Sequence, residues 1–196
     1  MKREEVHELH YITPMDNVTS ILCLGILSHA RVAKLKHESV AMAEIQEIRA
    51  NRQIPGARSL HEHVNLYFDA HNPMLSKVRG QNGTICVLRV NTKVLDLPGV
   101  IVADRNASSA YVTFRSVAEG IQSLDKDRLF ARYWTHPNDP LEEMRHKSEK
   151  CAEVLVPDNV SPELIVGAYV ANQVALGRWQ GLGVGLAAVV KYGLFF

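Results

Sequence analysis

The apolar stretches of this chain are short, and they do not alternate regularly between strand and helix patterns. Strand patterns cover residues 10–13, 64–68, 84–90, 100–103, 151–156, 165–171 and 184–190. Helix patterns cover residues 14–24, 39–48, 117–124 and 128–133. A doubly wound parallel sheet needs a helix between successive strands, so this order disfavours that architecture and predicts an α+β domain.

Chain length limits the number of domains. With 196 residues the chain can bury one sizeable core, and it leaves little room for a second. Hydrophobic residues make up 46% and charged residues 22%, which is typical of globular proteins and excludes disordered or collagen-like chains. We therefore expect residues 1–196 to form a single domain.

Cysteine spacing and apolar runs indicate in which cellular compartment the protein is found. Cys23, Cys86 and Cys151 are far apart and match neither a disulfide framework nor a zinc ribbon. No apolar segment follows the charged N-terminus as in a secretory signal. The longest apolar run, residues 182–190, is far shorter than the roughly 20 residues of a membrane helix. These features predict a cytoplasmic protein with no membrane span.

Basic residues are locally in excess between residues 31 and 58. This stretch holds six Lys and Arg residues against three Glu residues. Such an excess is typical of a solvated helix face, and it is also typical of a nucleic-acid contact. Charge alone leaves both interpretations open.

Glu153 interrupts an otherwise apolar strand pattern at residues 151–156. Alternation along a strand places it on the same face as Cys151 and Leu155. A carboxylate in that position needs a partner or a cleft, unless the strand lies at a sheet edge with Glu153 facing water. Both arrangements are compatible with the pattern.

Amide and aromatic side chains gather at residues 65–75. The amides Asn65 and Asn72 and the aromatic residues Tyr67 and Phe68 could together clamp a nucleotide. The alternative is that the aromatic and aliphatic members of this stretch belong to the core, as such residues usually do.

Two further motifs do not support a site. His61-Glu62-His63 and the pair His7 and His10 lack a third ligand at metal-binding spacing, so no metal site is expected. The glycine-rich residues 181–187 lack the strand, long helix and acidic residue of a dinucleotide-binding loop. We interpret these glycines as turn residues.

Four sequence blocks occur in the order and spacing of one known family. They are YITPMDNV at 11–18, NLYF at 65–68 with NPML at 72–75, DRNA at 104–107, and AEVLVP at 152–157. Through these blocks, which span about the first 170 residues, the chain resembles the DarT-type DNA ADP-ribosyltransferase toxins. The resemblance implies a fold of two small, roughly perpendicular sheets with short helices around an NAD⁺ cleft.

The resemblance also implies roles for individual residues. Glu153 matches the catalytic glutamate, and Arg49 matches an arginine that serves the NAD⁺ phosphates and the reaction centre. The residues expected to bind NAD⁺ are His10, Tyr11, Thr13, Tyr67, Asn72 and Met74. The residues expected to contact DNA are Arg52, Arg145 and Lys147, the last two in a charged loop before Glu153.

These residue types suit the implied chemistry. Cleavage of the nicotinamide to ribose bond leaves positive charge on the ribose, which a carboxylate stabilises, and a carboxylate can also accept the proton of an attacking base nitrogen. Arginine suits phosphate groups because it donates two parallel hydrogen bonds. The resemblance further implies NAD⁺ as co-substrate without a metal, single-stranded DNA as acceptor, and an antitoxin that removes the modification.

Two positions depart from the family pattern. Tyr11 stands where a histidine is common, so His10 could serve in its place, and His71 stands where many members carry arginine. Guanine and thymine are both compatible targets, and residues 142–148 resemble the guanine branch more closely. The alternatives are a non-catalytic module that binds single-stranded nucleic acid, or a transferase that modifies RNA or protein.

Overall fold

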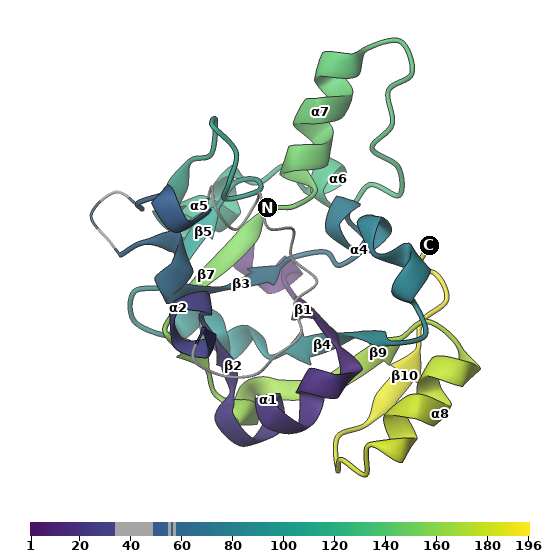
Figure 1. Cartoon of the computed structure of the whole chain (residues 1–196). Helices are drawn as coiled ribbons and strands as arrows, with labels where there is room; N and C mark the ends of the chain where they lie inside the picture. The colour runs from purple at the N-terminus through teal and green to yellow at the C-terminus, as the bar shows by residue number, and fades with distance from the viewer. Residues whose placement is uncertain (34–48, 55, 57) are drawn as a thin grey trace.

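A computed structural model describes residues 1–33, 49–54, 56 and 58–196. Its main sheet has eight strands in the order β10-β9-β4-β1-β3-β7-β5-β6, and β2 pairs with β8 in a separate two-stranded sheet (Figure 1). The strands are β1 (Leu9–Pro14), β2 (Ile26–Leu27), β3 (His63–Tyr67), β4 (Ile85–Val90), β5 (Ile101–Ala103), β6 (Phe114–Ser116), β7 (Glu153–Pro157), β8 (Asn159–Val160), β9 (Ile165–Val170) and β10 (Ala188–Val190).

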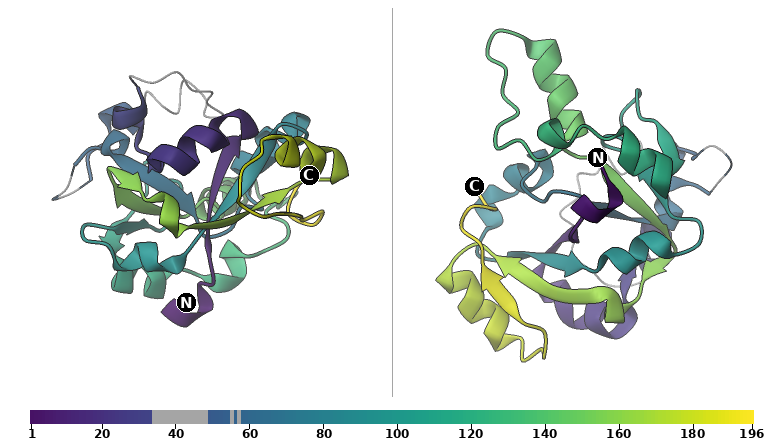
Figure 2. Two further views of the ribbon diagram at one scale, coloured as in Figure 1. Left: turned by 90° about the horizontal axis from the view of Figure 1, so that it is seen from below. Right: turned by 180° about the vertical axis from the view of Figure 1, so that it is seen from behind.

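Short helices surround the sheets. The α-helices are α1 (Val18–Leu24), α2 (His29–Val32), α4 (Pro73–Lys77), α5 (Val117–Ser123), α6 (Lys126–Leu129), α7 (Pro140–Glu149) and α8 (Gln173–Gly181). The 3₁₀ turns are η1 (Arg3–Glu5), η2 (Met15–Asn17), η3 (Leu60–Glu62), η4 (Arg79–Gln81), η5 (Thr92–Asp96) and η6 (Pro162–Leu164). Helix α7 projects from the body at the end opposite α8 (Figures 1 and 2). The predicted α+β class is confirmed.

In the main sheet, the neighbouring strands with the fewest register pairs are β1 and β3. These strands share a single register pair, His10 with Tyr67, whereas β1 and β4 share six pairs and β3 and β7 share five. The strands of this one sheet thus fall into two groups, β10-β9-β4-β1 and β3-β7-β5-β6, which are joined at this pair.

Strand β7 lies inside its group and has neighbours on both sides. It pairs with β3 on one side and with β5 on the other. Val154 and Val156 pack into the largest apolar cluster, while Leu155 packs into another on the opposite face. The edge-strand alternative for Glu153 is therefore wrong, because both edges of β7 are already hydrogen-bonded.

The first helix differs in part from its prediction. Thr13 and Pro14 still belong to β1, and α1 starts only at Val18 after a 3₁₀ turn, because Thr13 and Pro14 pair with Cys86 and Ile85 of β4. The predicted end at Gly25 is confirmed. Its φ is +86°, and a β-carbon there would lie 2.4 Å from the carbonyl oxygen of Val160, so glycine is required.

The C-terminal region contains an element that the pattern did not predict. Helix α8 has Asn172 as its N-cap, and Trp179 donates from its indole nitrogen to the Leu186 carbonyl at 3.0 Å. The glycine-rich residues 181–187 form the connection from α8 to β10, with Gly183 at φ +65°. Only residues 188–190 of the predicted last strand pair with β9.

Some predictions fall outside the described residues. The helix expected at residues 39–48 lies there, as do Lys34 and Lys36 of the basic stretch. In the part of the chain that the structure describes, no helix has the length and apolar character needed to span a membrane.

Candidate active site

His10, Tyr67 and Glu153 lie in one row across the sheet. His10 of β1 is opposite Tyr67 of β3, and Tyr67 is opposite Glu153 of β7. Residues directly opposite each other point to the same face. Two strand spacings separate the backbones of His10 and Glu153 by about 10 Å. The junction of the two strand groups thus places these side chains on one face of the sheet.

The Glu153 carboxylate is fully buried and holds three hydrogen bonds. Arg49 donates from Nη1 to both carboxylate oxygens, at 3.1 and 3.3 Å, and its side chain is almost as buried. The backbone N–H of Ala107 donates to Oε1 at 3.0 Å. A cation and an amide thus replace the water that the buried carboxylate has lost. The structure thus places Arg49 in contact with Glu153, and the catalytic roles of both residues stay predictions.

The Ala107 amide is aimed by the loop that follows β5. Ala103, the last residue of β5, is opposite Glu153, which sets the loop beside the carboxylate. The Asn106 amide donates to the Ser148 carbonyl at 2.9 Å, and the Asn106 side chain accepts from the Ser108 amide at 2.9 Å. No role in the site was predicted for residues 104–107, because a backbone donor leaves no signature in side-chain type.

Arg52 lies at the same loop. Its Nη2 donates to the Ser108 carbonyl at 3.4 Å, and its side chain is half-buried. Arg58 is paired with Asp158 at 2.8 Å, and Arg31 donates to Asn159 at 3.1 Å. These three arginines, in the described part of the basic stretch, thus already contact other groups of the molecule. A contact of Arg52 with DNA stays a prediction.

Two buried titratable groups neighbour Glu153. Burial, and then the charge of Glu153, raises the pKa of Tyr67 well above its usual value. Burial, and then the same charge, raises the pKa of Cys151 to about 12. Both therefore stay protonated at neutral pH, and Cys151 supplies no thiolate nucleophile.

Three of the residues expected to bind NAD⁺ lie on β1, and their side chains point to opposite faces of this strand. His10 lies on the Glu153 face, whereas Tyr11 is opposite Leu88 and packs against the largest core cluster on the other face. Thr13 follows the alternation of Tyr11 and is buried, with its hydroxyl accepting from Asn17 at 3.3 Å. Tyr11 and Thr13 therefore point to the face of β1 opposite that of His10, because alternate strand residues point apart.

Asn72 and Met74 lie in and beside the core. Asn72 is fully buried; its Oδ1 accepts from the Leu75 amide at 3.0 Å and its Nδ2 donates to the Asp69 carbonyl at 2.8 Å, so it caps α4. Met74 is half-buried against the cluster that contains Tyr67. Phe68 and Leu75 are core residues, as the alternative interpretation expected. NAD⁺ contacts by Asn72 and Met74 stay predictions.

His71, the departure noted before the NPML block, holds two other segments. Its Nδ1 is 2.8 Å from the Leu194 carbonyl and its Nε2 is 3.3 Å from the Arg132 carbonyl. Its ring stacks on Phe196 with centroids 4.3 Å apart. The histidine thus joins α4 to the end of the described chain.

The charged residues before Glu153 form helix α7, so the predicted loop is wrong. Asp139 caps the helix by accepting from the Glu142 amide at 2.9 Å, and Pro140 occupies its first turn. The helix predicted at residues 128–133 is also wrong in extent, since α6 ends at Leu129. Pro140 therefore lies at the start of a helix, directly after the N-cap Asp139.

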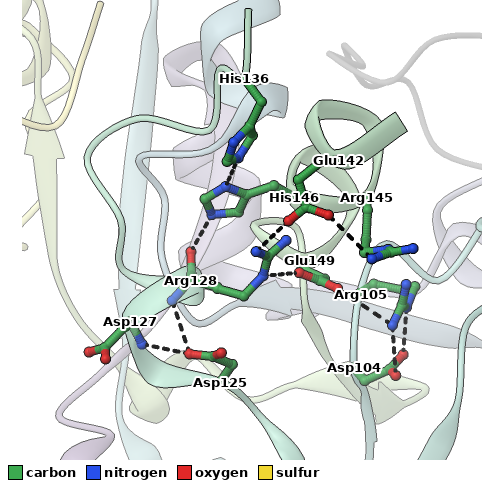
Figure 3. Close-up of polar contacts among 10 residues, drawn as sticks. All are labelled: Asp104, Arg105, Asp125, Asp127, Arg128, His136, Glu142, Arg145, His146 and Glu149. Atoms are coloured by element: carbon green, nitrogen blue, oxygen red, sulfur yellow. Dashed lines mark hydrogen bonds and ion pairs between the residues drawn. The ribbon is translucent and has the colours of Figure 1, made fainter. Parts of the chain in front are cut away.

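Arg128 and Arg105 fasten α7 to the body (Figure 3). Arg128 donates from Nη1 to Glu142 at 2.6 Å and from Nε to Glu149 at 2.5 Å. Arg105 pairs with Asp104 at 3.2 Å and approaches Glu149 at 3.8 Å. Through Arg105 and the Asn106 amide, the end of α7 is tied to the loop whose next amide, Ala107, binds Glu153.

Arg145 and Lys147 lie on the outer side of α7. Their side chains are 64% and 45% exposed, and they pair within the helix with Glu142 at 3.2 Å and Glu143 at 2.6 Å. His146, by contrast, is buried between His136 and the Arg128 carbonyl (Figure 3). The two cations are accessible to DNA but partly neutralised. Their contact with DNA stays a prediction.

A search for metal ligands gave no site. Within residues 1–33, 49–54, 56 and 58–196, no three His, Cys, Asp or Glu side chains are grouped so that they could hold an ion. His61 instead stacks with His29, with ring centroids 4.2 Å apart.

Comparison with solved structures defines the class of fold. Thermus sp. 2.9 DarT in complex with ADP-ribosylated ssDNA matches with a TM-score of 0.84 at 23% identity, covering 100% of this chain and 99% of that one. Thermosipho africanus DarTG in complex with ADP-ribose matches with a TM-score of 0.82 at 27% identity, covering 97% of this chain and 51% of that one. The fold is that of an ADP-ribosyltransferase.

Sequence comparison identifies the family. The family model described as ssDNA thymidine ADP-ribosyltransferase, DarT, matches residues 10–189. A DNA ADP-ribosyl transferase of Thermus sp. (strain 2.9) is 30% identical over 169 residues, which are 80% of this chain and 78% of the relative. This chain belongs to the DarT family.

A second relative is a longer protein. The DNA ADP-ribosyl transferase-DNA ADP-ribosyl glycohydrolase fusion protein of Thermosipho africanus (strain H17ap60334) is 33% identical over 172 residues. The match covers 84% of this chain and 42% of that relative. This chain therefore corresponds to less than half of the fusion protein.

Proposed function

We propose that this protein transfers ADP-ribose from NAD⁺ to a base of single-stranded DNA. The observation that carries the proposal is the buried Glu153 carboxylate, held by Arg49 and the Ala107 amide on the same face as Tyr67 and His10. Family membership and the relatives named as DNA ADP-ribosyl transferases support it. Residues 1–196 would act as one catalytic domain.

Glu153 would have two roles in this reaction, first stabilising charge and then accepting a proton. The bond between ribose C1′ and the nicotinamide nitrogen breaks, nicotinamide leaves with the electron pair, and the carboxylate stabilises the positive charge on the ribose. A base nitrogen then forms a bond to C1′, and its proton passes to Glu153. Arg49 and the Ala107 N–H hold the carboxylate in place, and a contact of Arg49 with the pyrophosphate stays a prediction.

Thymine is the base that we propose as the target. The description of the matching family names thymidine. The preference for guanine depended on residues 142–148, which lie on α7 and present mainly ion-paired side chains. Guanine is the alternative that the experiment below separates.

We further propose a partner and a location. One relative joins a DNA ADP-ribosyl transferase to a DNA ADP-ribosyl glycohydrolase in one chain. A separate glycohydrolase that removes ADP-ribose from DNA would serve this chain as an antitoxin. Both proteins would act in the cytoplasm, where NAD⁺ and DNA are available.

Labelled NAD⁺ tests the proposal. The purified protein is incubated with NAD⁺ labelled in the adenosine and with single-stranded DNA, duplex DNA, RNA or protein, and the labelled product is separated. We expect label on single-stranded DNA. Oligonucleotides in which thymine is the sole reactive base should be labelled, and those in which guanine is the sole reactive base should not. Label on RNA or protein alone would favour the other transferase activities, and DNA binding without label would favour the non-catalytic module.

A further inference from the structure

Glu8, just before β1, connects three strands of the sheet. Its Oε1 accepts from the Tyr169 hydroxyl at 2.7 Å and lies 3.2 Å from Nε2 of His10. Its Oε2 accepts from Nε of Arg89 at 2.7 Å. Tyr169 belongs to β9 and Arg89 to β4. The Arg89 guanidinium also lies over the Tyr169 ring, 4.9 Å from its centroid.

Glu8 is ionised at neutral pH. Burial opposes its charge, but hydrogen bonds from His10, Tyr169 and Arg89 outweigh burial and lower the pKa of Glu8 to about 2. An ionised carboxylate only accepts hydrogen bonds, so the hydrogen between Glu8 and His10 must be carried by Nε2 of the imidazole. The contact with Glu8 thereby selects one tautomer of His10.

The other ring nitrogen of His10 is buried without a partner. His10 is 8% exposed, and its Nδ1 has no hydrogen-bond partner among the described residues. With the hydrogen on Nε2, the neutral ring has a lone pair on Nδ1. A buried polar atom without a partner costs folding free energy, and such atoms commonly have a functional reason.

His10 is placed where it can meet the substrate of the proposed reaction. It lies in the row with Tyr67 and Glu153, and its backbone is about two strand spacings, or 10 Å, from that of Glu153. That separation is comparable with the extent of a nicotinamide riboside. A ligand whose ribose lies at Glu153 can therefore present a hydrogen-bond donor near His10.

We propose that Glu8 is a positioning residue that fixes the tautomer of His10, so that Nδ1 of His10 accepts a hydrogen bond from NAD⁺. The donor on the ligand is the nicotinamide carboxamide or a ribose hydroxyl, which are the neutral donors in that half of the molecule. This inference rests on the proposed function. The charged Arg89 holds Oε2 of Glu8, which leaves Oε1 facing His10.

Glu8→Gln is the substitution that tests the role of the charge. The charged Arg89 holds the amide oxygen of the glutamine, which turns the amide NH₂ toward Nε2 of His10. Nε2 must then accept, the hydrogen moves to Nδ1, and the acceptor offered to the ligand becomes a donor. We expect NAD⁺ to bind about tenfold more weakly, the loss of one buried hydrogen bond.

Tyr169→Phe is the matched control. It removes one donor to Oε1 of Glu8 and leaves the contacts of Glu8 with His10 and Arg89 in place. We expect its NAD⁺ affinity to stay within about twofold of the unsubstituted protein, because the tautomer of His10 is unchanged. Thermal unfolding of both variants reports whether any loss of affinity comes from a loss of fold.

Nuclear magnetic resonance of the imidazole nitrogens tests the tautomer directly in the unsubstituted protein. The shifts of Nδ1 and Nε2 should show hydrogen on Nε2, and the Nδ1 signal should move when NAD⁺ is added. In Glu8→Gln the two nitrogens should exchange character. A hydrogen on Nδ1 in the unsubstituted protein would overturn the proposal, even if Glu8→Gln does not fold.

Binding of ADP-ribose, which lacks nicotinamide, distinguishes the two donors. If the carboxamide donates to His10, Glu8→Gln weakens NAD⁺ and leaves ADP-ribose unchanged; if a ribose hydroxyl donates, it weakens both. Equal affinity of the variant and the unsubstituted protein for both ligands would overturn the inference. Absence of NAD⁺ binding to the unsubstituted protein would instead contradict the proposed function.

Discussion

Helix α7 and strand β7 follow each other in the chain, yet their charged side chains lie in opposite environments. On α7, Arg145 and Lys147 are exposed and pair with glutamates three and four residues away. On β7, Glu153 has no exposed surface and pairs with Arg49, which is 104 residues away in sequence. Exposed pairs contribute about 0–1 kcal/mol, whereas removing one partner of a buried pair costs about 3–5 kcal/mol.

Lys150 marks the boundary between the two environments. It directly follows α7, its side chain is fully buried, and its Nζ contacts Asp69 at 2.5 Å and the Leu129 carbonyl at 2.8 Å. Asp69 also accepts from the His71 amide at 2.9 Å. The change from solvated to buried charge thus occurs within a few residues. The contribution of a charged side chain to stability here therefore depends more on its burial than on whether it is paired.

Glu153→Gln is expected to have the largest effect. Glutamine keeps the shape of the side chain but removes both the charge that stabilises the ribose and the base that accepts a proton. We expect transfer to DNA to fall by about two orders of magnitude or more, with NAD⁺ still bound. Single-turnover transfer and NAD⁺ binding are measured on the same preparation. Transfer near the unsubstituted rate would remove Glu153 from the mechanism.

Lys150→Met should have a large effect on stability. Methionine fills a similar volume but leaves Asp69, whose side chain is only 16% exposed, without its cation, so we expect the free energy of unfolding to fall by about 3 kcal/mol. Urea unfolding measures it through the shift of the midpoint at unchanged slope. The double variant Lys150→Met/Asp69→Asn should recover part of the loss. A loss below about 1 kcal/mol would place this pair with the exposed ones.

Arg145→Ala/Lys147→Ala should have the smallest effect on stability, below about 1 kcal/mol. Its effect should appear in DNA binding, where two lost phosphate contacts reduce the slope of log affinity against log salt by up to about 1.4 for a single strand. NAD⁺ affinity should not change. Arg178→Ala on α8 removes a similarly exposed, ion-paired cation at the far end of the molecule and serves as the control. An unchanged salt slope would contradict the DNA contact.

The sequence predicted the strands better than the segments between them. Residues 84–90 and 165–171 were predicted as strands, and the structure has β4 and β9 there. Strand β4 is buried on both faces, and such strands leave apolar runs whatever their neighbours. Helix α8 was missed because it contains Gly177 and has few apolar residues on one face. Helix α7 was taken for a loop because its composition is almost entirely polar.

The site was predictable only in part. Glu153 stood out as a carboxylate in an apolar strand, and the resemblance associated Arg49 with it; the structure places the two in contact. The Ala107 amide, the Lys150–Asp69 pair and the Glu8 cluster were not predicted. Each includes a contact between residues at least 46 positions apart in sequence. In the Glu8 cluster these are the contacts of Glu8 with Arg89 and Tyr169.

The sequence by itself determined the α+β class, the family and the identity of the central carboxylate, because periodicity, motif order and an out-of-place charge are all properties of local sequence. Only the tertiary structure decided that β7 lies between β3 and β5, which donors reach Glu153, and that Tyr11 and His10 face opposite sides of β1. Strand order and register arise from backbone hydrogen bonds between distant segments, and those bonds are not specified by the side-chain pattern of any one segment.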